Sequence, residues 1–318
     1  MVSFQFLKFD GVCSTIAISL CPILDKYDGT EPSCYSRNAE LGGTLIFQPA
    51  TVIMQIIALM MTSVMIYHIK MKYTAVGRKE IVMFFYAFMG TTFLDMLLVS
   101  GIVPSASSVY PYFAAMQVSC MTMTCWILLL NGFVGFQFAE DGTAWSVWSI
   151  RISASVVWII CFVFSMLTLL GIGSFNLANP TLLWIIYFIV NGITLAIYIV
   201  SQIILVVGTL DDLWPVGDIL FGLGFFLIGQ VVMYVFSTDI CDAAGHYIDG
   251  MFFGSSCTLL AVMMVYKYWD SITKEDLEFA VTAKGNSYEV REMIVDDEHS
   301  VVGRGSGYLH ADRIEGGY

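Results

Sequence analysis

The sequence predicts an all-α polytopic membrane protein, a bundle of seven transmembrane helices with a lumenal N-terminus and a cytoplasmic C-terminus. Three observations lead to this fold class. The 318 residues are 58% hydrophobic and only 13% charged, which is too apolar for a water-soluble core. The apolar residues fall into runs of roughly 20, the length of helix that crosses a bilayer. Basic residues gather on one side of these runs.

Seven charge-poor runs are long enough to cross a membrane as helices. The fourth and fifth come from one charge-free stretch, 152–210, which is far too long for a single crossing. Gly171, Gly173 and Pro180 interrupt it and predict a helical hairpin. The predicted spans are 44–69, 81–103, 111–138, 146–170, 181–207, 216–237 and 247–266.

The distribution of Lys and Arg sets the orientation, because basic residues resist translocation. The loop after the first span carries Lys70, Lys72, Arg78 and Lys79 and is therefore expected in the cytoplasm. With alternating crossings, eleven of the 14 basic residues fall on that side. The exceptions are Lys8, Lys26 and Arg37.

This topology divides the chain into three parts. Residues 1–43 form a lumenal segment with three cysteines, and 44–268 form the seven-helix bundle. Residues 269–318 form a cytoplasmic tail that holds eleven of the 26 acids and few large apolar residues, which predicts disorder. The first thirty residues lack the basic, apolar and small-residue order of a secretory signal, so we expect the start to be retained.

The cysteines support the same topology. Four of the eight lie inside predicted spans, where small thiols usually pack. The other four fall on the predicted lumenal side, where an even number suggests two disulfides. Three pairings are possible, and four free thiols remain an alternative. We favour Cys13 with Cys21 and Cys34 with Cys241, which would attach the N-terminal segment to the loop before the last helix.

Asp95 lies deep in the second span, where a carboxylate costs a few kcal/mol and marks a candidate functional site. It could belong to a ligand, ion or proton site. Alternatively, it could accept a hydrogen bond from a Gln, Asn or Tyr of a neighbouring helix. We favour the second interpretation, because no Lys or Arg inside a span offers a counterion.

Amide side chains make up most of the other polar residues in the spans. Amides hydrogen-bond between helices and stabilise bundles by about 1 kcal/mol each. Members that face lipid would instead form a docking surface for another membrane protein. The set comprises Gln48, Gln55, Gln117, Asn131, Gln137, Asn191, Gln202 and Gln230.

We find no pattern typical of an enzyme, a metal site, a cofactor site or a nucleic-acid-binding surface. His68, His246, His299 and His310 are too scattered to converge on a catalytic metal. Asp242, His246 and Asp249 would align at i, i+4 and i+7 if the last helix began early, but a solvated helix end is the favoured interpretation. No basic arm suggests nucleic acid, and no phosphate-binding loop or nucleophile elbow is present.

A seven-helix receptor or sensor with a ligand site near Asp95 is the alternative class. Its usual local marks are missing. The third span ends in FAEDGT, at 138–143, where a rhodopsin-like receptor has Asp-Arg-Tyr, and the seventh contains no Asn-Pro-x-x-Tyr run. The only candidate lysine, Lys267, lies at the cytoplasmic end of the last span and not at the mid-point where a retinal would attach.

Seven segments resemble the fungal chitin synthase export chaperone family. They cover most of the chain up to Phe279 and are not generic motifs of membrane proteins. They are CYSRNAEL (34–41), KYTAVGRKE (72–80), YPYF (110–113), FAEDGT (138–143), GQVVMYVFSTDIC (229–241), HYIDGMFFGSSC (246–257) and MMVYKYWDSITKEDLEF (263–279).

The resemblance implies a non-enzymatic chaperone of the endoplasmic reticulum membrane. Its partner would be a chitin synthase, itself polytopic, which it would help to fold and to reach the cell surface, in support of cell-wall chitin synthesis. The chaperone could accompany the synthase to the plasma membrane. In the tail, Asp276 with Glu278 and Asp296 with Glu298 could act as export signals that bind vesicle coat proteins, although a solvated acidic tail is the favoured interpretation.

Overall fold

The computed structural model describes residues 8–28, 33–72, 75, 77–136, 142–172, 180–209 and 213–273. The chain forms two compact units, Met1–Asp270 and Ser271–Tyr318. The boundary between them falls about one turn before the described end of the last helix.

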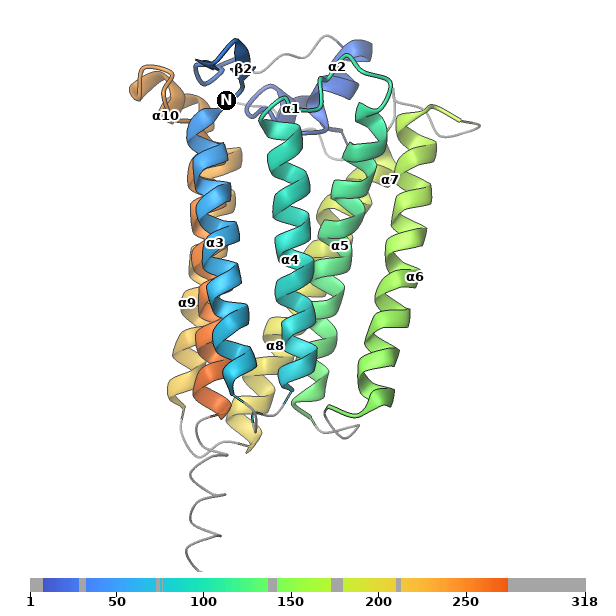
Figure 1. Ribbon diagram of the computed structural model, residues 1–318, viewed down its shortest axis with the longest axis vertical. Coiled ribbons are helices and arrows are strands. Elements are labelled where there is room, and N and C mark those ends of the chain that lie inside the picture. Colours follow the sequence, from blue (N-terminus) through green and yellow to red (C-terminus); the bar gives the residue numbers. More distant parts are fainter. Residues whose placement is uncertain are drawn as a thin grey trace, which may run out of the picture. The chain divides into compact units, whose positions relative to one another are not determined.

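Among the described residues, seven helices are long and apolar enough to cross a membrane, which confirms the predicted fold class (Figure 1). The third, α5, is the centre of the bundle, because 56% of its most apolar stretch is buried against 17% for the sixth, α9. The helices are Pro49–Met71 (α3), Arg78–Val99 (α4), Tyr110–Val134 (α5), Ala144–Leu169 (α6), the continuous Thr181–Thr209, Trp214–Tyr234 (α9) and Gly250–Thr273.

The first span begins later than predicted. A hairpin of two short strands, β1 (Ala39–Leu41) and β2 (Thr44–Ile46), precedes it. Gly42 and Gly43 form its two-residue turn, and both have positive φ, which glycine adopts without strain. The helix then starts at Pro49, whose fixed φ suits a first helical turn. The predicted boundary at residue 43 is therefore about five residues too early.

The fifth span is one helix with an irregular turn. It begins as α7 (Thr181–Trp184), continues as the π-helical segment η1 (Ile185–Val190) and ends as α8 (Asn191–Thr209). A π-helical turn shifts the following side chains around the helix axis and often occurs at functional sites. Here it places Asn191 directly after the irregular turn.

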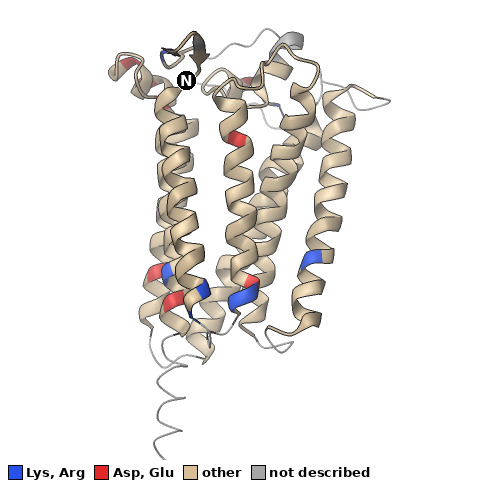
Figure 2. Cartoon of the chain, in the orientation of Figure 1, with Lys and Arg blue, Asp and Glu red and all other residues tan. Residues whose placement is uncertain are grey.

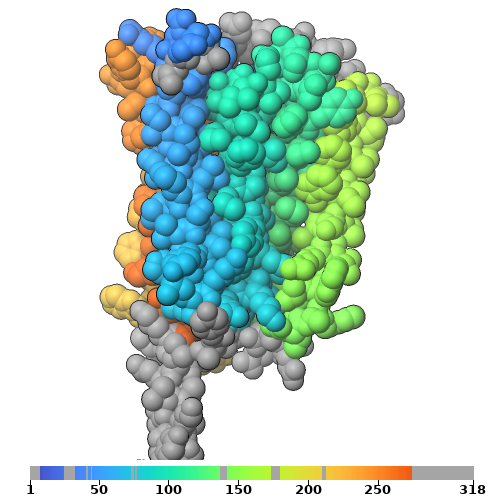
Figure 3. Space-filling view, in the orientation of Figure 1, coloured from blue at the N-terminus to red at the C-terminus, as the bar shows by residue number. Residues whose placement is uncertain are grey.

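One end of the bundle, the cap end, carries the N-terminal elements. These are α1 (Asp10–Cys13), α2 (Cys21–Asp28) and the β hairpin, with α10 (Ser237–Ala243) beside them (Figure 1). The N–H of Phe47 donates to the carbonyl of Ser100 at 3.1 Å, which attaches the hairpin to the end of α4. The opposite end, where α3 ends and α4 begins, is called the base end (Figure 1 and Figure 3).

Candidate functional site

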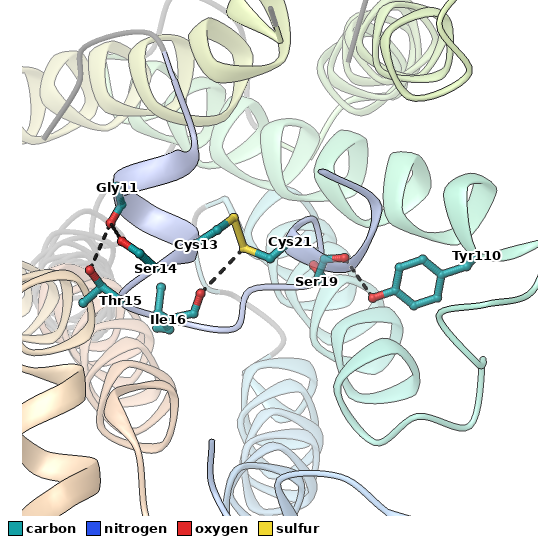
Figure 4. Close-up of a disulfide and its surroundings, with 8 residues drawn as sticks. All are labelled: Gly11, Cys13, Ser14, Thr15, Ile16, Ser19, Cys21 and Tyr110. Atoms are coloured by element: carbon teal, nitrogen blue, oxygen red, sulfur yellow. Dashed lines mark hydrogen bonds between the residues drawn. A yellow bond between two sulfur atoms is a disulfide. The ribbon is translucent and has the colours of Figure 1, made fainter. Parts of the chain in front are cut away.

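The N-terminal segment is a folded cap with its own apolar contacts. Phe9, Val12, Ile16 and Leu20 are buried and belong to one hydrophobic cluster with residues of α5 and α7. The hydroxyl of Tyr110, the first residue of α5, donates to the carbonyl of Ser19 at 2.8 Å (Figure 4). The cap therefore packs on the helices and does not extend away from them.

Two disulfides fix the cap, with the pairing favoured from the sequence. Cys13 and Cys21 close a short loop within the N-terminal segment (Figure 4). Cys34 and Cys241 are 207 residues apart and join the stretch before the hairpin to α10. Because α10 directly precedes the last span, this second disulfide links the segment before the first span to the segment before the last. The remaining four cysteines, Cys120, Cys125, Cys161 and Cys257, are free thiols.

His246 lies against the second disulfide. Its Nδ1 is 3.0 Å from the sulfur of Cys34, and its carbonyl accepts the N–H of Arg37 at 2.7 Å. The Arg37 guanidinium lies over the ring of Tyr247, 4.9 Å from its centre. Cys34, Cys241 and His246 are close enough to share a metal ion, but both sulfurs are committed to the disulfide and offer no thiolate.

The alignment considered for Asp242, His246 and Asp249 is wrong. The helix α10 ends at Ala243 and the last span begins at Gly250, with His246 at a positive φ of 67° between them. Asp249 instead caps the last span, since its Oδ1 accepts the N–H of Phe252 at 3.2 Å. Burial raises the pKa of the Asp249 carboxyl, while this bond and that of Thr51 oppose the rise.

Asp95 accepts hydrogen bonds from two amides on neighbouring helices. The Nε2 of Gln55 on α3 donates to its Oδ2 at 2.7 Å, and the Nε2 of Gln117 on α5 donates to its Oδ1 at 3.4 Å. The structure thus brings together three of the residues singled out from the sequence. The contacts are of the interhelical kind that we favoured for Asp95, and they join α3, α4 and α5.

Gln202 forms a second interhelical junction. Its Nε2 donates to the carbonyl of Gly132 on α5 at 3.1 Å, and its Oε1 accepts the hydroxyl of Tyr268 at 3.0 Å. A Cβ at Gly132 would lie 2.7 Å from that nitrogen, so this close contact requires glycine. The remaining amides bond within their own helices or face the interior. Asn131 donates to Ile127, and Asn191 donates to Tyr187. Gln137 lies outside the described residues.

Two buried carboxylates at the base end were not recognised from the sequence. Glu80, with no exposed surface, accepts the hydroxyl of Ser146 at 3.0 Å and the N–H of Gly142 at 2.8 Å. Asp218 lies in the first turns of α9, only 3% exposed, and pairs with Lys267 at 3.0 Å. Asp95 is therefore not alone among the acids of the described spanning helices, since Glu80 and Asp218 are also buried. The signal was available, because Asp218 falls inside the predicted sixth span.

The contacts of Glu80 bring two separate sequence segments together in space. Glu80 ends the segment KYTAVGRKE, and Gly142 belongs to FAEDGT. The adjacent Lys79 donates to the carbonyl of Gly142 at 2.8 Å. The N–H and the C=O of Gly142 are therefore both hydrogen-bonded to neighbouring side chains of α4. The first turn of α4 and the residues directly before α6 are therefore joined at the base end.

A cavity of about 460 Å³ lies among the helices. Its lining extends from Ile18 and Ser19 of the cap to Asp218 and Tyr268 near the base end. Most lining side chains are apolar or aromatic. The polar ones include Asp95, Gln55, Gln117, Asn191 and Gln230.

A capped bundle of seven helices, each long and apolar enough to cross a membrane, defines a polytopic membrane protein among the described residues. The sequence model of the chitin synthase export chaperone family matches residues 5–283. The chain belongs to this family.

Relatives from several fungi match nearly the whole chain. A chitin synthase export chaperone of Coccidioides immitis is 49% identical over 92% of this chain and 90% of its own length. Those of Phaeosphaeria nodorum and Cryptococcus neoformans are 48% and 46% identical, over 96% and 99% of this chain and 93% and 89% of their own lengths. No solved structure matches the chain.

Proposed function

We propose that this protein is a membrane chaperone of the endoplasmic reticulum that helps a chitin synthase to fold and to leave for the cell surface. The observation that carries the proposal is the match to chitin synthase export chaperones over almost the full length of both chains. In this role the protein supports cell-wall chitin synthesis without catalysing a reaction itself. The two described histidines agree with this, since His68 lies in α3 near the base end and His246 at the cap end.

The proposed topology places the cap end in the lumen and the base end in the cytoplasm. Figure 2 shows Lys and Arg of the described helices gathered toward the base end, as expected for a cytoplasmic face. Both disulfides lie at the cap end, where an oxidising lumen would maintain them. We accordingly propose residues 1–43 as lumenal, 44–268 as the bundle and 269–318 as the cytoplasmic tail, with the first boundary moved to Pro49.

The burial of the amide side chains limits which of them could contact a chitin synthase. Gln55, Gln117, Asn191 and Gln202 are buried inside the bundle, so they are not available at the lipid-facing surface. Among the described amides, a docking surface would be restricted to Asn131, which is partly exposed and does not line the cavity.

This part of the proposal is tested by co-purification. Asn131→Leu should weaken recovery of a tagged chitin synthase in mild detergent, because the variant loses an intramembrane hydrogen-bonding group. Ile204→Leu, at an exposed apolar position, is the matched control and should co-purify fully. Full recovery with the Asn131→Leu variant would refute docking through the described amides and leave the export role untouched.

The tail residues Asp276, Glu278, Asp296 and Glu298 lie outside the described residues. We propose that the two acidic pairs bind vesicle coat proteins during export. Replacing the four by Asn or Gln should then slow departure of the chaperone–synthase complex from the endoplasmic reticulum. Unchanged departure would assign the acids to solvation alone.

The export role itself is tested in a fungal strain that lacks its own chaperone of this family. Expression of the full chain should move a fluorescently tagged chitin synthase from the endoplasmic reticulum to the plasma membrane and restore cell-wall chitin. A second polytopic plasma-membrane protein serves as the control and should be unaffected throughout. Retention of the synthase despite normal expression of the chain would contradict the proposal.

A further inference from the structure

The internal cavity has the size and lining of a ligand site. Its volume of about 460 Å³ lies within the range of roughly 300–1,000 Å³ that small-molecule sites occupy, and such sites combine apolar walls with a few convergent polar groups. Phe88, Leu195 and Val262 contribute apolar surface from three different helices. Asp95 and its two amide partners, Gln55 and Gln117, form one polar group in this lining. The walls therefore suit an apolar body, and the polar group suits a head.

The hydrogen bonds around Asp95 leave a surplus of acceptors. Gln55 and Gln117 each use an amide N–H on the carboxylate. Their own amide oxygens, and that of Asn191, are buried and have no partner among the described residues. These three side chains are 2%, 6% and 6% exposed. A buried acceptor without a donor costs about 1–3 kcal/mol, so this site is complementary to a group that donates several hydrogen bonds and accepts none.

The charges around the cavity favour the binding of a cationic ligand. Its described lining residues include two acids, Asp95 and Asp218, and no Lys, Arg or His. Asp218 is paired with Lys267, which approaches from the base end, whereas the contacts of Asp95 are with amides. A carboxylate so placed is stabilised by a positive partner. An ammonium group offers both the charge and three donors.

Aromatic rings line the same cavity beside the irregular turn η1. Tyr187 and Phe188 pack edge to face with centres 4.8 Å apart, and Phe188 contacts Tyr234 at 5.7 Å. All three line the cavity. Aromatic faces attract cations, particularly where water is excluded. The π-helical turn places two of these rings and Asn191 on its cavity-lining surface, which agrees with the frequent occurrence of such turns at functional sites.

We propose that the cavity binds one membrane amphiphile whose head is a protonated amine. The ammonium donates to Asp95 and to the free amide oxygens of Gln55 and Gln117, and the apolar body lies along the cavity. This site does not rest on the proposed export function, since it is argued from the cavity and its hydrogen bonds alone.

The proposal is tested by binding of radiolabelled dodecylamine to the full chain in phosphatidylcholine nanodiscs, with empty nanodiscs to measure partition into lipid. Binding should be saturable at one site per chain. Dodecanol has the same chain but no charge, and dodecyltrimethylammonium has the charge but no N–H donor. Neither should compete as well as unlabelled dodecylamine. Binding no greater than that of empty nanodiscs, or equal competition by dodecanol, would overturn the proposal.

Two variants locate the site. Asp95→Asn removes the charge and should weaken binding roughly tenfold or more, because charge-assisted hydrogen bonds are the stronger ones. Asp218 lines the same cavity, but its carboxylate is already paired with Lys267. The Asp218→Asn variant should therefore bind dodecylamine as the wild type does. Equal affinity of the Asp95→Asn variant would refute the assignment.

Gly192→Leu provides a second route that leaves every titratable group in place. Gly192 lines the cavity, and a Cβ there meets no atom within 4 Å. The leucine should reduce dodecylamine binding by occupying space, without disturbing the fold. Undiminished binding would contradict the site even if Asp95→Asn failed to fold. The assay contains no chitin synthase, so its failure and the failure of the export assay are separate results.

Discussion

The cap end and the base end of the bundle are held by different chemistry. At the cap end, two disulfides and backbone hydrogen bonds fix the N-terminal segment and α10 to the helices. At the base end, carboxylates do the same work: Glu80 bonds Ser146 and Gly142, and Asp218 pairs with Lys267. The difference matches the proposed topology, because thiols oxidise on the lumenal side and stay reduced on the cytoplasmic side.

The comparison also separates the carboxylates by the kind of partner that each has. The side chain of Lys267 is 58% exposed, whereas that of its partner Asp218 is 4% exposed. The long lysine side chain therefore reaches the buried acid while it remains in contact with water. Asp95 has amides instead. An ion pair stabilises Asp218, whose partner can reach water, and amide contacts stabilise Asp95. The two ends should therefore fail under different treatments.

The largest effect is expected from loss of the long-range disulfide. Cys34→Ser with Cys241→Ser should lower stability by about 2–5 kcal/mol, since removing a native disulfide frees the unfolded chain and loosens the native cap. Thermal unfolding in nanodiscs measures the change. Reductant should also lower the unfolding temperature of the wild type. Cys257→Ser, which changes a free thiol, should keep the full response to reductant. A wild type insensitive to reductant would contradict a stabilising role for the disulfides.

The second largest effect is expected at Glu80. Glu80→Ala leaves the Gly142 N–H and the Ser146 hydroxyl without their acceptor, at a cost of about 1–3 kcal/mol. Glu80→Gln keeps one acceptor oxygen and should lose less. Both variants should respond to reductant as the wild type does, because the cap is unchanged. If Glu80→Ala abolished the reductant response, the two ends would not be independent.

Much of the fold was predictable, because apolar run length decides the number of spans. The β hairpin was missed since Thr44, Leu45 and Ile46 are apolar enough to read as the start of the first span. In the structure, Gly42 and Gly43, both with positive φ, form the turn that divides this stretch into two strands. The length of an apolar run therefore does not distinguish a strand from the start of a helix.

The site was predictable only in part. Asp95 could be identified as unusual, but its partners depend on which faces of α3, α4 and α5 meet. These helices are apolar nearly all round, so periodicity does not indicate the inward face. For the same reason the cavity and the pairing of Asp218 with Lys267 could not be derived from the sequence. Cysteine positions, in contrast, were constrained to one side by the topology.

A smaller effect is expected from the base-end ion pair. Lys267→Met leaves Asp218 buried without its partner and should cost about 1–2 kcal/mol, less than for a fully buried pair because the lysine is half exposed. Asp218→Asn should cost less, since the remaining amide is neutral. The double variant should be close to Asp218→Asn alone. Additive losses in the double-mutant cycle would show that the two side chains do not interact.

The smallest effect, and the sharpest contrast between the ends, concerns Asp249 at the cap end. Asp249→Ala removes the acceptor for the Phe252 N–H and should cost about 1 kcal/mol, the usual worth of a helix cap. Asp249→Asn retains a capping oxygen and removes the charge. Asparagine caps as well as aspartate, so this variant should match the wild type at neutral pH or exceed it slightly.

The pH dependence distinguishes capping from charge at this position. Burial raises the pKa of Asp249 in the folded protein, so the folded state binds its proton more readily than the unfolded state does. The ionised carboxyl therefore disfavours folding above the raised pKa, and this penalty disappears as the pH falls through it. Lowering the pH from 7 should stabilise the wild type relative to Asp249→Asn in parallel unfolding measurements. The opposite sign would mean that the hydrogen bonds from Phe252 and Thr51 outweigh burial, so that charge stabilises the cap end as it does the base end.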